Sequence, residues 1–319
     1  MKPVVLVTGA DLAPQAISLL KEFELVYAGK TPDEESLVRL CREHRPVALI
    51  VRYGKVSARI MDEAPGLKVI AKHGVGVDTI DVDAAAERGI AVKPAIGANA
   101  TAVAEHTWAL ILACAKSLAH LNYRMQEGHW DKATHKNIEL ADRTLGLVGL
   151  GAIGERVAQI GIAFGMKVVA HDPYRETAPA GVRLCSLHDV VAAADVVSLH
   201  CPLTPENHNL FDRAMLARLR DGSILVNTAR GGLIDENALI DVLRAGKLRA
   251  AGLDCFAQEP VTGTHALATI PNVICSPHIG GVTEEAYVNM GTAAARNILV
   301  TLGDQGRVLA RAPRNEGAI

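Results

Sequence analysis

Residues 144–172 read TLGLVGLGAIGERVAQIGIAFGMKVVAHD and decide the fold of this chain. An apolar run at residues 145–150 predicts a buried strand, and apolar side chains at helical spacing follow the glycines from Ile153 to Phe164. A second apolar run, at residues 166–170, predicts another strand, which ends just before Asp172. Strand, glycine turn, helix and strand in this order predict a parallel sheet covered by helices, because consecutive parallel strands need a crossover between them.

The three glycines of the turn have separate physical roles in binding a dinucleotide. Gly149 permits the sharp turn, Gly151 lets backbone amides approach a pyrophosphate, and Gly154 lets the helix pack closely on the strand. Glycines also make turns with no ligand, but here Asp172 lies 18 residues after Gly154, at the tip of the next strand. A carboxylate there accepts hydrogen bonds from a ribose 2′-hydroxyl and repels a 2′-phosphate, so we expect NAD as cofactor, while the nearby Arg175 leaves NADP open.

Length and composition exclude several classes of protein. The chain has 319 residues, of which 49% are hydrophobic and 21% charged, as in a globular protein of roughly two domains. The formal net charge is −2 and aromatic residues make up only 3%. Because the chain has no long basic run, we expect neither nucleic acid nor an anionic membrane as a partner.

Cysteine usage and the apolar segments favour a cytoplasmic location. The six cysteines form no C-x-x-C pair, and most lie in apolar runs, so we expect buried free thiols in a reducing compartment. The first residues, MKPVVLVTGAD, predict a strand rather than a signal peptide, because the short apolar run leads straight to an acid. Glu105, His106 and Lys116 interrupt the most apolar predicted helix, so no membrane span is expected.

The remaining elements repeat the alternation of strand and helix. Residues 99–125 are the exception and predict one long helix, and residues 121–142 predict a polar, irregular arm. Strands are predicted at residues 3–8, 24–28, 47–51, 68–71, 90–93, 145–150, 167–171, 196–200, 224–227, 250–254 and 273–275. A last helix, predicted at residues 283–302, would return to the first unit, and the tail after it is predicted to be mobile.

This pattern predicts an α/β protein with two doubly wound parallel-sheet domains, flavodoxin-like and Rossmann-like, and an active-site cleft between them. Residues 1–98 and 283–319 would form a discontinuous substrate-binding domain, and residues 99–282 the NAD-binding domain. Ligands of such sheets bind outside the carboxyl ends of the strands. The candidates for chemistry are therefore Arg52 and residues 73–78, 200–202, 227–232, 254–260 and 276–281.

Several of these segments closely resemble, in order and spacing, the NAD-dependent D-isomer-specific 2-hydroxyacid dehydrogenases. The segments are VGLGAIGERVAQIGIAFGMKV, VVSLHCPLTPENHNLF, GSILVNTARGGLIDENAL, GLDCFAQEP and SPHIGG. KHGVGVDTIDVDAAAERGI and NATAVAEHTWALIL are similar to the family's substrate-side loop and crossover helix, so the resemblance covers nearly the whole chain.

The resemblance implies an enzyme that transfers hydride between NADH and C2 of a small 2-oxo acid of glyoxylate or hydroxypyruvate type. Arg230 would bind the substrate's carboxylate and carbonyl oxygens, because a guanidinium offers paired donors. His278 would donate a proton to the carbonyl oxygen, and Glu259 would raise the pKa of the imidazole. A structural ion pair for Arg230 and a solvated loop acid for Glu259 are the non-catalytic alternatives.

The resemblance also implies further cofactor contacts and no catalytic metal. Asp254 would face the nicotinamide or support Arg230, and a helix-capping role is the alternative. The full set of cofactor-binding residues expected is Gly149, Gly151, Ala152, Ile153, Gly154, Asp172, Cys201, Pro202, Thr228, Ala229, Asp254 and Gly280. The twelve histidines form no H-E-x-x-H or other ligand cluster, and hydride transfer needs no metal.

The first domain would select the substrate. Val75 and Gly76 resemble the family's backbone donors to the substrate carboxylate. Arg52 with Lys55 and Lys72 makes the edge of the site positive, which suits a small anion with or without a phosphate. A D-3-phosphoglycerate dehydrogenase lacking the regulatory domain is therefore an alternative. Tyr53 stands where phosphoglycerate-type enzymes have a small residue, and the loop at residues 52–57 is one residue short, so both features disfavour phosphoglycerate.

The sequence is also compatible with two other classes of protein. One is an NAD(H)-sensing protein like the C-terminal-binding protein corepressors, which resemble this family and keep its triad. The other is a formate or phosphite dehydrogenase, although formate enzymes carry Gln where Glu259 stands here. The helix at residues 102–119 and the arm after it resemble the family's dimer contacts, so a homodimer is expected.

Overall fold

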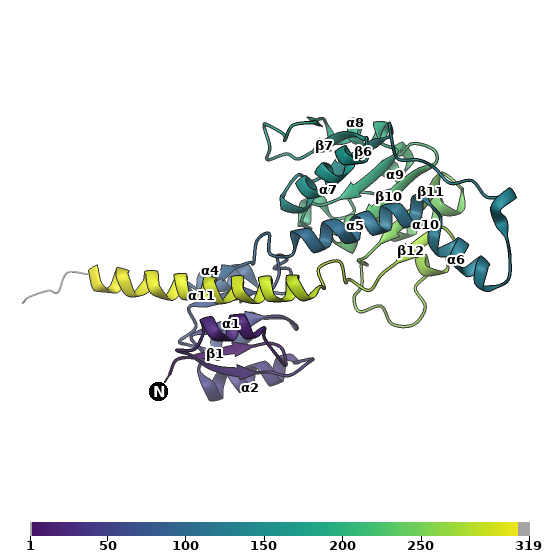
Figure 1. Ribbon diagram of the computed structural model, residues 1–319. Helices are drawn as coiled ribbons and strands as arrows, with labels where there is room; N and C mark the ends of the chain where they lie inside the picture. The colour runs from purple at the N-terminus through teal and green to yellow at the C-terminus, as the bar shows by residue number, and fades with distance from the viewer. Residues whose placement is uncertain (1, 312–319) are drawn as a thin grey trace, which may run out of the picture. The chain divides into compact units, whose positions relative to one another are not determined.

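The computed structural model describes residues 2–311 and divides the chain into two compact units. One consists of Met1–Asn99 with Thr283–Ile319, and the other of Ala100–Val282. The domains expected from the sequence were 1–98 with 283–319, and 99–282, so one boundary differs by a residue. Each unit is an α/β layer structure with a parallel sheet, as predicted (Figure 1).

The first unit is built on a five-stranded parallel sheet in the order β2-β1-β3-β4-β5. The strands are β1 (Val4–Val7), β2 (Glu24–Tyr27), β3 (Ala48–Val51), β4 (Val69–Lys72) and β5 (Ala91–Lys93). The order reverses direction between β1 and β3. In an open α/β sheet such a switch point leaves a crevice outside the carboxyl ends of the two strands.

Helices cover both faces of this sheet because its strands are apolar on both sides. Val5 and Val7 point to a face covered by α1 (Pro14–Leu19) and α11 (Glu284–Arg311), whereas Leu6 points to the opposite face. The second face is covered by α2 (Glu34–His44), α3 (Ala58–Asp62) and α4 (Val82–Glu87). Asp33 and Asp81 begin two of these helices by accepting hydrogen bonds from Ser36 and Ala84 amides.

The second unit is built on a seven-stranded parallel sheet in the order β12-β11-β10-β9-β6-β7-β8. The strands are β6 (Thr144–Val148), β7 (Lys167–His171), β8 (Val182–Leu184), β9 (Val196–Leu199), β10 (Ser223–Asn227), β11 (Leu248–Leu253) and β12 (Val273–Cys275). Its switch point lies between β6 and β9, which places the glycine turn after β6 at the crevice.

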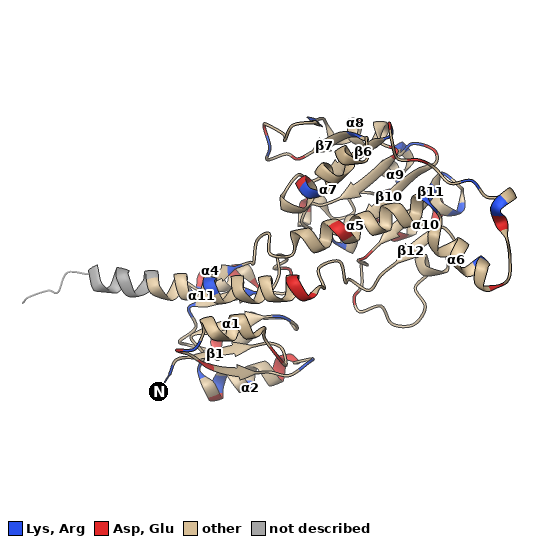
Figure 2. Cartoon of the chain, viewed as in Figure 1, with Lys and Arg blue, Asp and Glu red and all other residues tan. Residues whose placement is uncertain are grey.

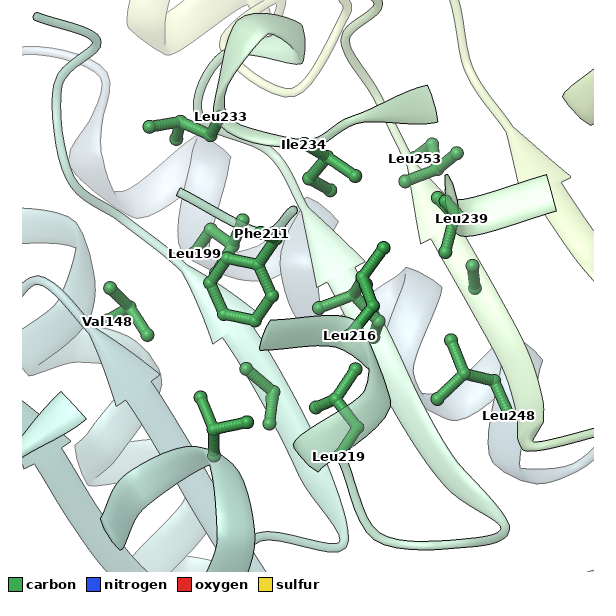
Figure 3. Close-up of a cluster of buried hydrophobic side chains, with 14 of the residues drawn as sticks. Val148, Leu199, Phe211, Leu216, Leu219, Leu233, Ile234, Leu239, Leu248 and Leu253 are labelled. Atoms are coloured by element: carbon green, nitrogen blue, oxygen red, sulfur yellow. The ribbon is translucent and has the colours of Figure 1, made fainter. Parts of the chain in front are cut away.

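Two apolar cores sandwich the larger sheet. One face packs against α5 (Ala100–Ala115) and α7 (Ala152–Ala163), and the other against α8 (Leu187–Ala193), α9 (Arg213–Arg218) and α10 (Glu236–Arg244). Figure 3 shows the second core, in which the buried Phe211 ring lies among leucine and valine side chains. Charged residues of both signs lie on helices and loops (Figure 2). The buried strands β9 and β10 carry none.

Four sequence predictions about elements were wrong in detail. The long helix expected at residues 99–125 is broken at Ser117, whose left-handed φ of 48° separates α5 from α6 (Leu118–Gln126). The arm expected to be irregular from residue 121 is therefore helical to Gln126. The sequence also missed β8, an edge strand too short to show a pattern. Helix α11 continues to Arg311 rather than ending at residue 302, and residues 312–319 of the expected mobile tail lie outside the described part.

None of the helices described between residues 2 and 311 combines the length and the apolar character that a membrane crossing requires.

Candidate active site

The glycine turn after β6 is shaped by contacts that no other residue would fit. Gly149 has a φ of +98°, and a Cβ on it would lie 2.7 Å from the carbonyl carbon of His200. A Cβ on Gly154 would lie 2.3 Å from the carbonyl oxygen of Gly149. The packing of the chain on itself therefore requires glycine at both positions, as the turn and helix-packing roles predicted.

Gly151 differs from its two neighbours. A Cβ on Gly151 would meet no protein atom within 4 Å, so nothing in the protein excludes a side chain there. The residue precedes α7, where no side chain caps the first amides of a 12-residue helix. Open space beside uncapped amides at a helix N-terminus fits a pyrophosphate, with Ala152 and Ile153 in the first turn.

Asp172 holds the glycine turn in place. One carboxylate oxygen accepts a hydrogen bond from the Leu150 amide at 2.9 Å, and the other accepts from the Tyr174 amide at 2.9 Å. Arg175, which left NADP open in the sequence, forms an ion pair with Glu155 in the first turn of α7. Arg175 therefore pairs with Glu155 rather than with the Asp172 carboxylate.

The residues that directly follow β9 are uncharged. Burial lowers the pKa of His200 to about 3, so the ring is neutral, and it shares a 2.9 Å hydrogen bond with Ser198. Burial also raises the pKa of the Cys201 thiol to about 11, which leaves it protonated and unreactive. The carbonyl of Pro202 accepts a 2.7 Å hydrogen bond from Asn207 and so anchors the loop.

His278 and Glu259 are brought together as predicted for an acid–base pair. His278 follows β12 in a left-handed conformation, with a φ of 54°, and its Nδ1 lies 2.6 Å from Oε2 of Glu259. The other carboxylate oxygen, Oε1, accepts a 2.9 Å hydrogen bond from the Phe256 amide. Glu259 is therefore held at both oxygens, and Nε2 is the ring nitrogen that can pass a proton to a substrate.

The pair shifts both pKa values in the direction that keeps both groups charged. The hydrogen bond to Glu259 raises the pKa of His278, against the opposing effects of burial and of the Arg230 charge. Burial by itself would raise the pKa of Glu259, but the bonds from His278 and Phe256 and the nearby cations outweigh it, and the pKa is lowered. The imidazolium is thus stabilised near neutral pH.

Arg230 follows β10 in a loop that its neighbours define. Asn227 donates a 2.8 Å hydrogen bond to the Arg230 carbonyl and accepts one of 3.0 Å from the Ala229 amide. A Cβ on Gly231 would lie 1.9 Å from the carbonyl carbon of Phe256, so only glycine lets this loop meet the one that carries Glu259. Thr228 shares a 2.8 Å hydrogen bond with Thr107 of α5.

In the other unit, Arg52 follows β3 and is largely covered. Its side chain is 11% exposed, and Nη1 donates to the Asp11 carbonyl at 2.6 Å and also pairs with the Asp11 carboxylate. Val75 and Gly76 lie in the loop after β4, where Val75 is exposed. The Ala95 amide fixes the base of that loop with a 2.8 Å bond to the Gly74 carbonyl.

Within the part of the chain that the structure describes, no three His, Cys, Asp or Glu side chains are placed together to bind a metal ion.

The family to which the chain belongs follows from its match to a protein-family model. A model of the NAD binding domain of the D-isomer specific 2-hydroxyacid dehydrogenases matches residues 108–280, which contain the glycine turn, Arg230, Glu259 and His278. The chain belongs to this family. The predicted resemblance is therefore confirmed, and so is the pair of parallel-sheet units.

Relatives within the D-isomer specific 2-hydroxyacid dehydrogenase family differ in substrate. The chain is 41% identical to D-3-phosphoglycerate dehydrogenase of Mycobacterium bovis, over 95% of this chain but only 57% of that protein. It is 40% identical to hydroxypyruvate reductase of Thermotoga maritima, over 89% of this chain and 94% of that one. The structure of D-lactate dehydrogenase from Aquifex aeolicus, complexed with NAD and lactic acid, matches with a TM-score of 0.82 and 29% identity, over 98% of this chain and 100% of that one.

The side chain of Asp254, which was expected to face the nicotinamide or to support Arg230, lies against the loop around His278. Its buried carboxylate accepts hydrogen bonds from Ser276 Oγ at 2.7 Å and from the Ile279 and Gly280 amides at 2.9 and 2.8 Å. A Cβ on Gly280 would lie 2.9 Å from this carboxylate. Asp254 thus clamps the loop on both sides of His278, and it caps no helix.

Sequence reasoning missed one member of this clamp, His106, and one residue of the other unit, Asp11. His106 of α5 shares a 2.8 Å hydrogen bond with Ser276 and lies 3.4 Å from the Asp254 carboxylate. His106 stood in the quoted crossover motif, so its polar side chain on an otherwise apolar helix was an available signal. Asp11, the partner of Arg52, carried no such signal.

Proposed function

We propose that the protein is an NAD-dependent D-2-hydroxyacid dehydrogenase that reduces a small 2-oxo acid of glyoxylate or hydroxypyruvate type. The observation that carries this proposal is the 2.6 Å bond between His278 and Glu259, with the Arg230 charge acting on both groups. A proton donor beside a guanidinium suits reduction of a carbonyl that is next to a carboxylate. The similarity to a hydroxypyruvate reductase along 94% of its length supports the substrate class.

Each residue of the proposed triad has one task. When bound, NADH supplies the hydride. Arg230 would orient the substrate through its carboxylate and carbonyl oxygens, and His278 would donate the Nε2 proton to the carbonyl oxygen as negative charge develops there. Glu259 would hold the ring in the productive orientation and stabilise its charged form. In the oxidative direction, the neutral ring would take the proton of the hydroxyl group.

The residues around the glycine turn would bind the cofactor. The open space at Gly151 and the uncapped start of α7 support a pyrophosphate there, and the Asp172 carboxylate supports NAD over NADP. The cofactor contacts proposed are Gly149, Gly151, Ala152, Ile153, Gly154, Asp172, Cys201, Pro202, Thr228, Ala229, Asp254 and Gly280. Arg52, Val75 and Gly76 are proposed as substrate contacts with Arg230.

A screen of NADH oxidation tests the proposal. Glyoxylate, hydroxypyruvate, pyruvate and phosphohydroxypyruvate would each be supplied to the wild type and to His278→Ala. We expect turnover of the first two, and a loss in the variant of about a hundredfold or more, because general acid catalysis contributes about 10² to 10⁴. An absence of turnover with every 2-oxo acid would overturn the proposal.

A D-3-phosphoglycerate dehydrogenase is the second candidate, favoured by the 41% identity to the mycobacterial enzyme. The chain spans only 57% of that protein's length. Phosphohydroxypyruvate as the best substrate in the same screen would favour this candidate. Tight NADH binding without any turnover would instead favour an NAD(H)-sensing protein.

We also propose a cytoplasmic homodimer. Helix α6 and the arm after it expose four large apolar side chains, namely Leu118, Tyr123, Met125 and Trp130. The ion pair of Arg124 with Asp131, at 2.7 Å, holds the arm against α6. Several exposed large apolar side chains on one ordered segment support contact with a second copy of the chain.

A further inference from the structure

The switch point of the five-stranded sheet is occupied by a cluster of four polar side chains. Asp11 follows β1, Arg52 follows β3 and His73 follows β4, so the parallel strands bring all three to the carboxyl edge of the sheet. Tyr287 joins them from the first turn of α11 and donates a 2.9 Å hydrogen bond to the Asp11 carboxylate. Ligands of open α/β sheets bind at this edge.

The guanidinium of Arg52 is held in one place within this cluster. Nη1 donates to the carbonyl and to the carboxylate of Asp11. The rings of Tyr53 and Tyr287 lie on the guanidinium carbon at 5.3 and 5.0 Å. Beneath it, a Cβ on Gly9 would lie 3.0 Å from Arg52 Cδ. Asp11 itself is 67% exposed, so the carboxylate, and not the guanidinium, faces outward.

The cluster therefore carries no net charge near neutral pH. The bonds from Arg52 and Tyr287 lower the pKa of Asp11, which keeps it ionised opposite the arginine. Burial and the Arg52 charge lower the pKa of His73 to about 4, and burial raises that of Tyr287 to about 12, so both rings are neutral. Asp11 thus neutralises Arg52, one of the three cations from which the sequence predicted a positive edge, while the Lys72 ammonium lies beside the cluster and donates to the Arg52 carbonyl at 3.4 Å.

We propose that Asp11 is a specificity-determining residue, which occupies Arg52 and so rejects 2-oxo acids that carry a second anionic group. This inference rests on the proposed function. A phosphate that approached Arg52 would have to displace the Asp11 carboxylate or lie beside it, and like charges at such a distance repel. A hydroxymethyl group or a hydrogen atom in place of the phosphate-bearing group meets no such repulsion.

The test compares two substrates that differ only in the phosphate, hydroxypyruvate and phosphohydroxypyruvate. Asp11→Asn keeps the shape of the side chain, removes its charge and leaves Arg52 available to an anion. We expect kcat/KM for phosphohydroxypyruvate, relative to hydroxypyruvate, to rise by about tenfold or more, since one close charge pair contributes on that order. Glu63→Gln is the matched control, because Glu63 pairs with Arg42 on the same unit at 2.6 Å, and it should leave the ratio unchanged.

A change in the ratio smaller than about fivefold in Asp11→Asn would overturn the inference. If the role of Asp11 were purely structural, Asp11→Asn would lower kcat/KM for both substrates together and leave the ratio of the two values unchanged. Tyr287→Phe supplies a second variant, which removes one hydrogen bond from the Asp11 carboxylate and should shift the ratio in the same direction by a smaller factor. Failure of the proposed function looks different, because the wild type would then reduce neither substrate.

Discussion

At the residue scale, the bond between Glu259 and His278 determines the pH range in which His278 can act as an acid. The carboxylate raises the pKa of His278, and reduction needs the protonated ring. Glu259→Gln removes the charge but can still accept a hydrogen bond. We expect the alkaline limb of kcat/KM for reduction to move to lower pH.

A neighbouring carboxylate provides the control for this experiment. Glu236 accepts a 2.8 Å hydrogen bond from the Ala257 amide and lies 3.4 Å from His265. Glu236→Gln also removes one negative charge close to the loop that carries Glu259. It should leave the alkaline limb of kcat/KM at the wild-type pH. An equal shift in both variants would show that the negative charge of nearby carboxylates in general, and not the hydrogen bond to Glu259, sets the pKa of His278.

Asp254 is a positioning residue for His278. It accepts the Ile279 and Gly280 amides, and an amide nitrogen in its place would face one of these donors. Asp254→Asn should therefore loosen the loop and lower kcat by about tenfold to a hundredfold, because misplacement of a catalytic group by about 1 Å costs on that order. Ser276→Ala, which removes only one of the bonds, should lower kcat less. An unchanged kcat in Asp254→Asn would contradict this assignment.

At the scale of elements, the glycine turn separates what the fold requires from what a ligand requires. Gly154→Ala places a methyl group 2.3 Å from the Gly149 carbonyl, so we expect it to destabilise the unit by about 1–3 kcal/mol or more. Gly151→Ala meets no protein atom within 4 Å and should leave the melting temperature nearly unchanged. It should nevertheless weaken NADH binding by about tenfold, since the methyl group would occupy the space proposed for the pyrophosphate.

Thermal unfolding and NADH titration on both variants give the two readouts. Gly222 offers a control, because it has a positive φ but open space around it, so its substitution tests backbone strain alone. If Gly151→Ala bound NADH as tightly as the wild type, the pyrophosphate would have to lie elsewhere.

At the scale of the whole molecule, self-association is the property to measure. Trp130 is 75% exposed on the arm after α6, and a charge at the centre of a dimer contact is strongly unfavourable. We expect Trp130→Glu to convert a dimer to a monomer in gel filtration at micromolar concentration. Val300→Glu, at an exposed position of α11, is the control and should leave the elution volume unchanged. A wild type that elutes as a monomer would refute the dimer.

The sequence by itself determined every described strand except β8, most of the crossover helices and the residues at the strand ends. Apolar runs of three to six residues between turns predict buried parallel strands because both faces of such a sheet are covered. Gly149 and Gly154 were found from local sequence as well, since their roles depend on their own backbone or on a neighbour close along the chain, whereas the role of His278 came from the family resemblance. Local propensity failed at Ser117, because no glycine or proline announces that break.

Only the tertiary structure decided which side chains meet across the strand ends. Arg52 contacts Asp11 across 41 positions of the chain, and His106 meets Ser276 across 170. Neither spacing has a local pattern, because the order of the strands, and not the distance along the chain, brings these residues together. The sequence therefore counted Arg52 among the cations of a positive edge, and the fold neutralised its charge with the carboxylate that follows the neighbouring strand.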